Sequence, residues 1–154
     1  MQLGELLDPK AVKVVPKTSS KKRLFCDLAE AARQLYGVNY DEAFSALQDR
    51  EALGTTGVGG GVALPHARLS GLDRVHGVFM RLETPLDFDA TDRKPVDLVF
   101  ALFAPEGAGV AHLKALALVS RTLRDAGTCA KLRANDDPAV LHTVLTEAQK
   151  SEAA

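Results

Sequence analysis

The chain has 154 residues, of which 46% are hydrophobic and 25% charged, and its formal net charge is −1 at pH 7. These values are typical of one globular domain that is large enough to bury a sizeable core. The near-neutral charge argues against binding to nucleic acid, which depends on concentrated lysine and arginine. We interpret the short basic run KKR at 21–23 as the solvated start of a helix.

Cysteine content and hydropathy exclude two further classes of protein. Two cysteines, Cys26 and Cys129, are too few for a disulfide framework and form no CxxC pair. No apolar run approaches the roughly 18 residues that a membrane span needs, and no basic–apolar–small leader opens the chain. We therefore expect a cytoplasmic protein that does not insert into a membrane.

Hydrophobic periodicity and turn residues predict alternating strands and helices. In chain order, we expect a strand at 11–15, a helix from the hydroxyl cluster at 18–20 to about 36, a helix from Asn39 to about Gly54, strands at 75–82 and 96–105, a helix at about 111–126 and a last helix from Pro138. Gly127 is expected to end the helix at 111–126. The inner face of that helix is assigned to Leu113, Leu116, Ala117, Ser120 and Leu123.

The strand at 96–105 is almost continuously apolar, which indicates a central strand covered on both faces. No repeat, linker or low-complexity tract divides the chain. We therefore expect one α/β domain over residues 1–154, with a central mixed β-sheet and helices on both of its faces.

The stretch GTTGVGGGVALPHAR at 54–68 places four glycines in five positions and then joins Pro65 to His66. Glycine is costly to order, whereas proline fixes its own φ and biases the residue before it toward extended backbone. The pattern indicates backbone that bends closely around something and then a stiff segment that presents one imidazole. It fits neither a P-loop nor a dinucleotide fingerprint. Loop glycines that serve a tight hairpin remain the alternative.

The histidines predict phosphoryl chemistry better than metal binding. The four are His66, His76, His112 and His142. They form no HxxxH or HExxH pattern, so neither a metal nor a cofactor is expected. His112 opens a helix after a glycine-containing loop, where free N–H groups favour an anion. An imidazole that is partly neutral near pH 7 can accept a phosphoryl group if donors and positive charge surround it, and Arg50, Arg68 and His112 could converge there.

Four segments resemble one known family. They are SKKR at 20–23, REALGTTGVGGGVALPHAR at 50–68, LETPLDFDATDRKPVDLVFAL at 82–102 and HLKALALVSRTL at 112–123. Together they resemble the enzyme IIA components of the bacterial phosphotransferase system, fructose/mannitol type, and most nearly the nitrogen-regulatory enzyme IIA. The resemblance extends from about Leu3 to Thr146 and implies a mixed sheet flanked by helices.

The resemblance also implies the site. His66 is the residue expected to be phosphorylated, on Nε2, with His112 as the second histidine of the site and Arg50 as the arginine beside it. The rim is expected to include Thr55, Thr56, Gly61 and Arg68. Ala67 stands where many members have glycine, which restricts φ slightly in this loop.

The function implied is that of a phosphotransferase component acting mainly as a regulator. A phosphorylated histidine-carrier protein would be the donor, and the phosphorylation state would control binding to targets such as sensor kinases or potassium-transport proteins. One alternative is a sugar-transport enzyme IIA that passes phosphate to an enzyme IIB. The others are a module that binds an anion without covalent chemistry and, last, a metal enzyme.

Overall fold

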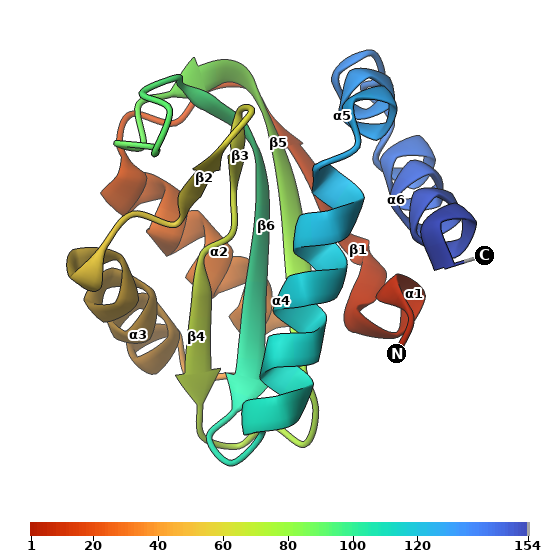
Figure 1. Cartoon of the computed structure of the whole chain (residues 1–154). Helices are drawn as coiled ribbons and strands as arrows, with labels where there is room; N and C mark the ends of the chain where they lie inside the picture. Colours follow the sequence, from red (N-terminus) through yellow and green to blue (C-terminus); the bar gives the residue numbers. More distant parts are fainter. Residues whose placement is uncertain (154) are drawn as a thin grey trace.

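A mixed sheet of six strands forms the centre of the described structure, and helices lie against both of its faces (Figure 1). The computed structural model describes the backbone of residues 1–153 and the side chains of residues 1–148. The strands are β1 (Leu7–Val15), β2 (Gly57–Gly59), β3 (Val62–Ala63), β4 (His66–Leu69), β5 (His76–Leu86) and β6 (Val96–Pro105). The helices are α1 (Leu3–Leu6), α2 (Lys21–Tyr36), α3 (Tyr40–Leu53), α4 (Gly109–Leu123), α5 (Ala126–Arg133) and α6 (Pro138–Ala153). The predicted fold class is confirmed.

The order of the strands places β4 beside the central strand. The sheet runs β1-β5-β6-β3-β2, and β4 also pairs with β6. β1 is parallel to β5, whereas β5 is antiparallel to β6 and β2 is antiparallel to β3. β3 and β4 follow one another along β6, both parallel to it, so that Val62 pairs with Leu98 and His66 pairs with Leu102. The register of the sheet therefore fixes the position of His66.

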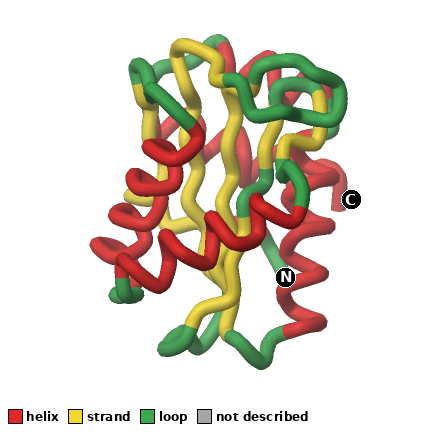
Figure 2. The backbone as a smooth tube through the Cα atoms, turned by 90° about the vertical axis from the view of Figure 1, so that its left-hand side faces the viewer, coloured by secondary structure: helices red, strands yellow, loops and turns green. Residues whose placement is uncertain are grey.

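The central strand β6 gives β4 a rigid neighbour. Residues 98–104 of this strand are all 0% exposed, which confirms the prediction of a strand covered on both faces. Figure 2 shows the strands between helices on either side. Because full burial of one large apolar side chain is worth about 1.5–3 kcal/mol, seven consecutive buried residues hold this strand firmly in the core.

Helices α2 and α3 begin and end where the sequence predicts. Ser20 caps α2 by accepting a backbone hydrogen bond at 3.0 Å, and Gly37 ends it with a φ of 72°. Asn39 caps α3 in the same way at 2.9 Å, and Gly54 follows its last residue. Arg50 therefore lies in the last turn of α3, as expected from the sequence.

Strands β1 and β5 both extend beyond the predicted ranges. β1 starts at Leu7, ahead of the predicted start at residue 11, and β5 continues to Leu86, past the predicted end at residue 82. The parallel pairing of β1 with β5 includes Leu7 opposite Gly77, and the N–H of Thr84 donates to the carbonyl of Pro16 at 3.2 Å. Pairing between distant segments therefore extends both strands past their local signals.

The helix predicted at 111–126 is present as α4 but ends earlier than predicted, and the helix that follows it, α5, was not predicted. α4 ends at Leu123, and Asp125 caps α5 by accepting a hydrogen bond from the N–H of Thr128 at 2.9 Å. Gly127 lies in the first turn of α5 and does not end a helix. The aspartate cap decides the break, and the glycine does not. Neither these helices nor any other described one is long and apolar enough to cross a membrane.

The inner face predicted for α4 is displaced by about one residue. The side chains buried against the sheet are those of His112, Ala115, Leu118, Val119, Thr122 and Leu123. Of the predicted inner residues, Leu123 is buried, whereas the side chain of Leu113 is 66% exposed. The observed register turns His112 inward and leaves apolar side chains on the surface beside it.

Candidate functional site

His66 is held at both ring nitrogens. It follows Pro65, whose carbonyl accepts a hydrogen bond from the N–H of Leu102 at 3.0 Å. Its Nδ1 lies 3.0 Å from the carbonyl oxygen of Leu64. Because a carbonyl oxygen can only accept, Nδ1 carries the proton of the neutral ring and Nε2 keeps a free lone pair. Arg50 donates from Nε to this Nε2 at 3.2 Å.

Burial keeps His66 neutral. It lowers the pKa of His66 below its ordinary value, and the positive charges of Arg50 and Arg68 lower it further. The Leu64 carbonyl and the Glu51 carboxylate act in the opposite direction and raise this pKa. The net direction is downward, so the ring is a neutral nucleophile near pH 7.

Arg50 is aimed by the end of its own helix. Its Nη1 donates to the carbonyl of Gly54 at 2.9 Å, while its Nε reaches His66. A cation also suits the carboxyl end of a helix, where unpaired carbonyl groups carry partial negative charge. The site therefore contains a guanidinium that is fixed to the backbone and adjacent to Nε2.

His112 lies beside His66 and has one buried ring nitrogen. Its ring lies across that of His66, with centroids 5.3 Å apart and an interplanar angle of 74°. Arg68 donates from Nε to Nδ1 of His112 at 3.4 Å, so the proton of the neutral ring is on Nε2. This Nε2 is buried, and the described part of the protein offers it no hydrogen-bond partner. Burial, followed by the nearby His66 and Arg68, lowers the pKa of His112 to about 4.

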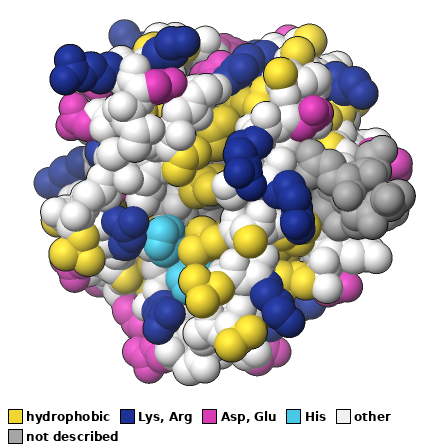
Figure 3. Space-filling model, in the orientation of Figure 1, with side chains coloured by type: hydrophobic (Ala, Val, Ile, Leu, Met, Phe, Trp, Pro, Cys, Tyr) yellow, Lys and Arg dark blue, Asp and Glu magenta, His cyan; other side chains and the backbone are white. Residues whose placement is uncertain are grey.

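Two adjoining shallow cavities contain most of the predicted site. One, of about 310 Å³, is lined by Arg50, Thr55, Thr56, Val58, Leu64, His66, Leu116, Ala117 and Ser120. The other, of about 290 Å³, is lined by Ala46, Arg50, His66, Ala67, Arg68, His112, Leu113 and Leu116. Figure 3 shows histidine side chains on this face, with basic and apolar side chains around them. Both histidines, both arginines and both threonines of the prediction therefore lie together.

Gly61 is not part of this cluster among the described residues. It lies in the turn of the β2–β3 hairpin, where Gly59, Gly60 and Gly61 have φ values of 100°, 67° and 78°. A Cβ on Gly61 would approach Arg133 and Asp97 rather than His66. The glycines therefore form the tight hairpin that the sequence analysis kept as the alternative, and Gly61 does not line either cavity at His66.

The two threonine hydroxyls are already engaged. Thr55 donates to the carbonyl of Phe88 at 2.9 Å. Thr56, which is 4% exposed, donates from its hydroxyl to the carboxylate of Glu51. Both threonines thus shape the site by fixing the backbone that leaves α3, and their hydroxyls are not free donors.

Sequence reasoning missed Glu51 and Lys21. The Nζ of Lys21 lies 3.0 Å from Oε2 of Glu51 and 4.5 Å from the centroid of the Phe88 ring, and the Glu51 side chain is 7% exposed. The interpretation of residues 21–23 as a solvated helix start is therefore wrong for Lys21. The sequence did contain a signal for this pair. A helix dipole disfavours a cation in the first turn of a helix, where Lys21 lies in α2, and an acid in the last turn, where Glu51 lies in α3.

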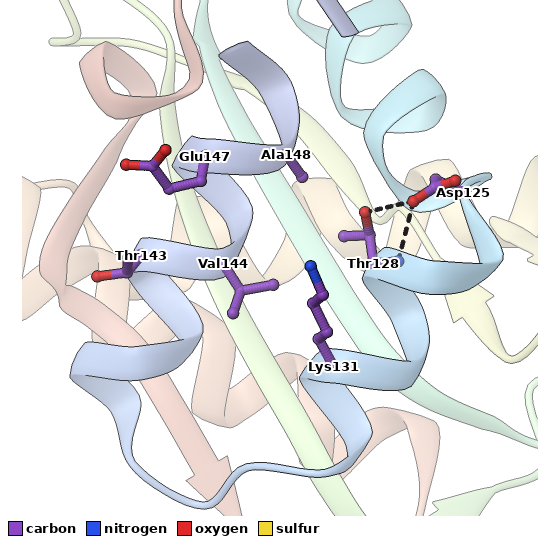
Figure 4. A pocket seen from close by; sticks show the side chains of 7 residues that line it. All are labelled: Asp125, Thr128, Lys131, Thr143, Val144, Glu147 and Ala148. Carbon is purple, nitrogen blue, oxygen red and sulfur yellow. Dashed lines mark hydrogen bonds between the residues drawn. The ribbon is translucent and has the colours of Figure 1, made fainter. Parts of the chain in front are cut away.

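A larger cavity, of about 570 Å³, lies between α5 and α6 (Figure 4). It is lined by Asp125, Thr128, Lys131, Thr143, Val144, Glu147 and Ala148. The carboxylate of Asp125 is occupied by the backbone and hydroxyl of Thr128, at 2.9 and 2.7 Å. No histidine or cysteine is among these described lining residues, and neither His66 nor His112 lines this cavity.

Comparison with known proteins shows the family to which the chain belongs. Residues 5–148 match the family model described as "Phosphoenolpyruvate-dependent sugar phosphotransferase system, EIIA 2". A nitrogen regulatory protein of Bradyrhizobium diazoefficiens is 48% identical over 145 residues, which are 94% of this chain and 95% of the relative. The crystal structure of the nitrogen regulatory protein IIA-Ntr from Neisseria meningitidis matches with a TM-score of 0.86 and 34% identity, over 94% of this chain and 99% of that one.

The mannitol IIA of Escherichia coli shares the fold, with a TM-score of 0.77 and 18% identity over 90% of this chain and 97% of that one. The chain belongs to the EIIA 2 family of the phosphoenolpyruvate-dependent sugar phosphotransferase system. Within that family it is similar to proteins named nitrogen regulatory protein. The resemblance inferred from the four sequence segments is confirmed.

Proposed function

We propose that the protein is a phosphoryl-accepting regulator of a nitrogen-related phosphotransferase system, phosphorylated on Nε2 of His66 by a phosphorylated histidine-carrier protein. One observation carries the proposal: the Leu64 carbonyl binds Nδ1 at 3.0 Å and leaves the lone pair on Nε2, which faces Arg50. Without this contact, the neutral ring could carry its proton on either nitrogen.

The transfer step balances without an added acid or base. The Nε2 lone pair of His66 attacks the phosphorus atom, and the bond from phosphorus to the donor imidazole breaks, with its electron pair returning to the donor nitrogen. His66 keeps its Nδ1 proton and becomes a phosphorylated imidazolium. The carbonyl of Leu64 accepts from Nδ1–H and stabilises that cation more strongly than it does the neutral ring.

Three groups surround the position of the transferred phosphoryl group. Arg50 releases the Nε2 lone pair and turns its donors to the phosphoryl oxygens, and Arg68 adds a second positive charge. His112, whose ring centroid lies 5.3 Å from that of His66, is proposed to add a donor through its unpartnered Nε2–H. Phosphoryl transfer depends mainly on such positioning and charge stabilisation.

Regulation follows from the charge that the phosphoryl group adds to this face. A gain of about −1.5 to −2 charges beside Arg50 and Arg68 changes which partner surfaces can dock there. The targets proposed are sensor kinases or potassium-transport proteins, and the relay would operate in the cytoplasm, as expected from the sequence.

A sugar-transport enzyme IIA is the second candidate, favoured by the description of the matching family model, which names a sugar phosphotransferase system. Both candidates share the chemistry at His66 and differ in the next acceptor. Rapid movement of phosphate from His66 to a purified enzyme IIB would favour transport.

The experiment is intact-mass analysis after incubation with the phosphorylated carrier protein. We expect one acid-labile phosphoryl group on the wild-type chain and none on His66→Ala, with unchanged circular dichroism. His142→Ala is the matched control, because His142 lies on α6 and its Nε2 lies 3.0 Å from the carbonyl of Leu7, away from the site. Undiminished labelling of a folded His66→Ala variant would refute the assignment.

A further inference from the structure

Glu51 lies behind the site, one residue after Arg50, with its carboxylate turned inward. Its oxygens accept from three donors: the Nζ of Lys21 at 3.0 Å, the N–H of Thr56 at 3.0 and 3.2 Å, and the hydroxyl of Thr56. An ionised carboxylate only accepts, so it suits three donors. A neutral amide of the same size has one accepting oxygen and two N–H groups, and it would face Lys21 or Thr56 with a donor.

A continuous chain of hydrogen bonds connects this carboxylate to the reactive ring. Glu51 holds the Thr56 peptide by its N–H, and the carbonyl of Thr56 accepts from the N–H of Leu64 at 2.9 Å. The carbonyl of Leu64 in turn accepts from Nδ1 of His66 at 3.0 Å. Three hydrogen-bond contacts, joined through the covalent backbone of Thr56 and of Leu64, thus connect the carboxylate to the ring.

We propose that Glu51 is a positioning residue for His66: it holds the Thr56 peptide and, through it, the Leu64 carbonyl that keeps the proton on Nδ1 and the lone pair on Nε2. This inference rests on the proposed phosphorylation of His66 for its consequence, but its structural content concerns the unmodified protein. The same carboxylate also holds the segment that follows Arg50, where Gly54 aims the guanidinium.

The location of Glu51 supports a role beyond packing. An acid in the last turn of α3 and a cation in the first turn of α2 each oppose the local helix dipole, and here they neutralise one another. Unfavourable local choices of this kind are expected at functional sites. Glu51 also acts on His66 against Arg50 and Arg68, because its charge raises the pKa of the ring while theirs lower it.

The test measures the tautomer of His66 directly. In the unphosphorylated protein labelled with ¹⁵N-histidine, ring nitrogen shifts report which nitrogen carries the proton at a pH well above the pKa of His66. We expect the Nδ1–H form in the wild type. Glu51→Gln is expected to bring in the Nε2–H form and to lower the pKa of His66. Asp49→Asn removes a charge from an exposed position of the same helix and is the matched control, expected to leave both readouts unchanged.

The transfer rate gives the functional consequence. Loss of the charge-assisted bonds of Glu51 is expected to slow phosphorylation by the carrier protein about tenfold or more, whereas Asp49→Asn stays within about twofold of the wild type. If the wild type accepts no phosphate at all, the proposed function fails, and the tautomer measurement still decides the role of Glu51.

A folded Glu51→Gln protein with the wild-type tautomer would overturn the proposal, even if its melting temperature fell, because the role of Glu51 would then be structural. If Glu51→Gln does not fold, Glu51→Asp decides in its place, since it keeps the charge and draws the carboxylate back from the N–H of Thr56. A shift of Glu51→Asp toward the Nε2–H form supports the proposal, and the wild-type form in this variant refutes it.

Discussion

Replacement of His112 with leucine is expected to make the protein more stable and a slower phosphoryl acceptor. The Nε2 of His112 is buried without a hydrogen-bond partner among the described residues, and the side chain is 5% exposed. A buried donor left unpaired costs about 1–3 kcal/mol, and leucine of similar volume removes that donor. The replacement also loses the contact from Arg68, which is long at 3.4 Å and therefore weak.

The replacement is expected to raise the stability of the fold and to lower the rate of phosphoryl transfer. We expect the free energy of unfolding to rise by about 1 kcal/mol, which raises the melting temperature by roughly 2–4 °C for a chain of this size. The transfer rate should fall because the donor to the phosphoryl oxygens is lost. One hydrogen bond to a charged group is worth about 1.5–3 kcal/mol, or about tenfold to a hundredfold in rate.

The same variant shows how much His112 contributes to the loss of folding stability at acidic pH. The pKa of His112 is lowered to about 4 in the folded protein, from its ordinary value of 6.5. Between these values the unfolded chain binds more protons than the folded one, so stability is full above pH 6.5 and falls as pH drops toward 4. His66 and His76, whose pKa values are also lowered, act in the same direction in both proteins. His112→Leu should therefore lose less stability on acidification than the wild type.

The assay combines urea unfolding at pH 7 and pH 5 with the time course of phosphorylation by the carrier protein. His142→Leu on α6 serves as a histidine replacement outside the site. A His112→Leu protein that is clearly less stable than the wild type at pH 7, yet accepts phosphate at the wild-type rate, would refute the reasoning on both counts.

Three further outcomes are expected. Arg50→Ala should slow transfer about tenfold or more and change stability by no more than about 1 kcal/mol, since its helix-end charge is worth about 0.3–1 kcal/mol; stopped-flow kinetics and thermal melting measure both. Gly61→Ala should destabilise by about 1 kcal/mol or more, because its φ of 78° and the nearby Arg133 leave no room for a Cβ, while the transfer rate stays within twofold. Phosphorylation of His66 should change the affinity of at least one partner more than twofold, as measured by calorimetry with the unmodified, phosphorylated and His66→Ala proteins; equal affinities throughout would indicate a plain carrier.

Signals in the local sequence were sufficient to predict the ends of α2 and α3 and the central strand β6. Ser20, Asn39 and Gly37 act within one helix turn, and the continuous apolar run of β6 has only one favourable environment. The break between α4 and α5 was missed because Asp125 and Gly127 are competing local signals two residues apart. The aspartate, which satisfies a free N–H group, prevailed.

The site was predictable as a set of residues but not as a set of contacts. The motif around Pro65 and His66 predicted the imidazole that the loop presents, and Arg50 lies beside it. The pairing of Arg68 with His112 joins β4 to α4, and that of Glu51 with Lys21 joins α3 to α2. Such contacts depend on how helices pack on the sheet, which no spacing along the chain encodes.

The arrangement around His66 serves both states of the proposed reaction without rearrangement of the fold. Burial and the charges of Arg50 and Arg68 favour the neutral ring before transfer. After transfer the same arginines face the phosphoryl oxygens, and the Leu64 carbonyl that selected the tautomer supports the cation that has formed. Since the buried strand β6 holds β4 in register, we expect the core to keep its structure when His66 is phosphorylated. The proposed signal is therefore a change of charge on one surface, which a partner must read by contact with that surface.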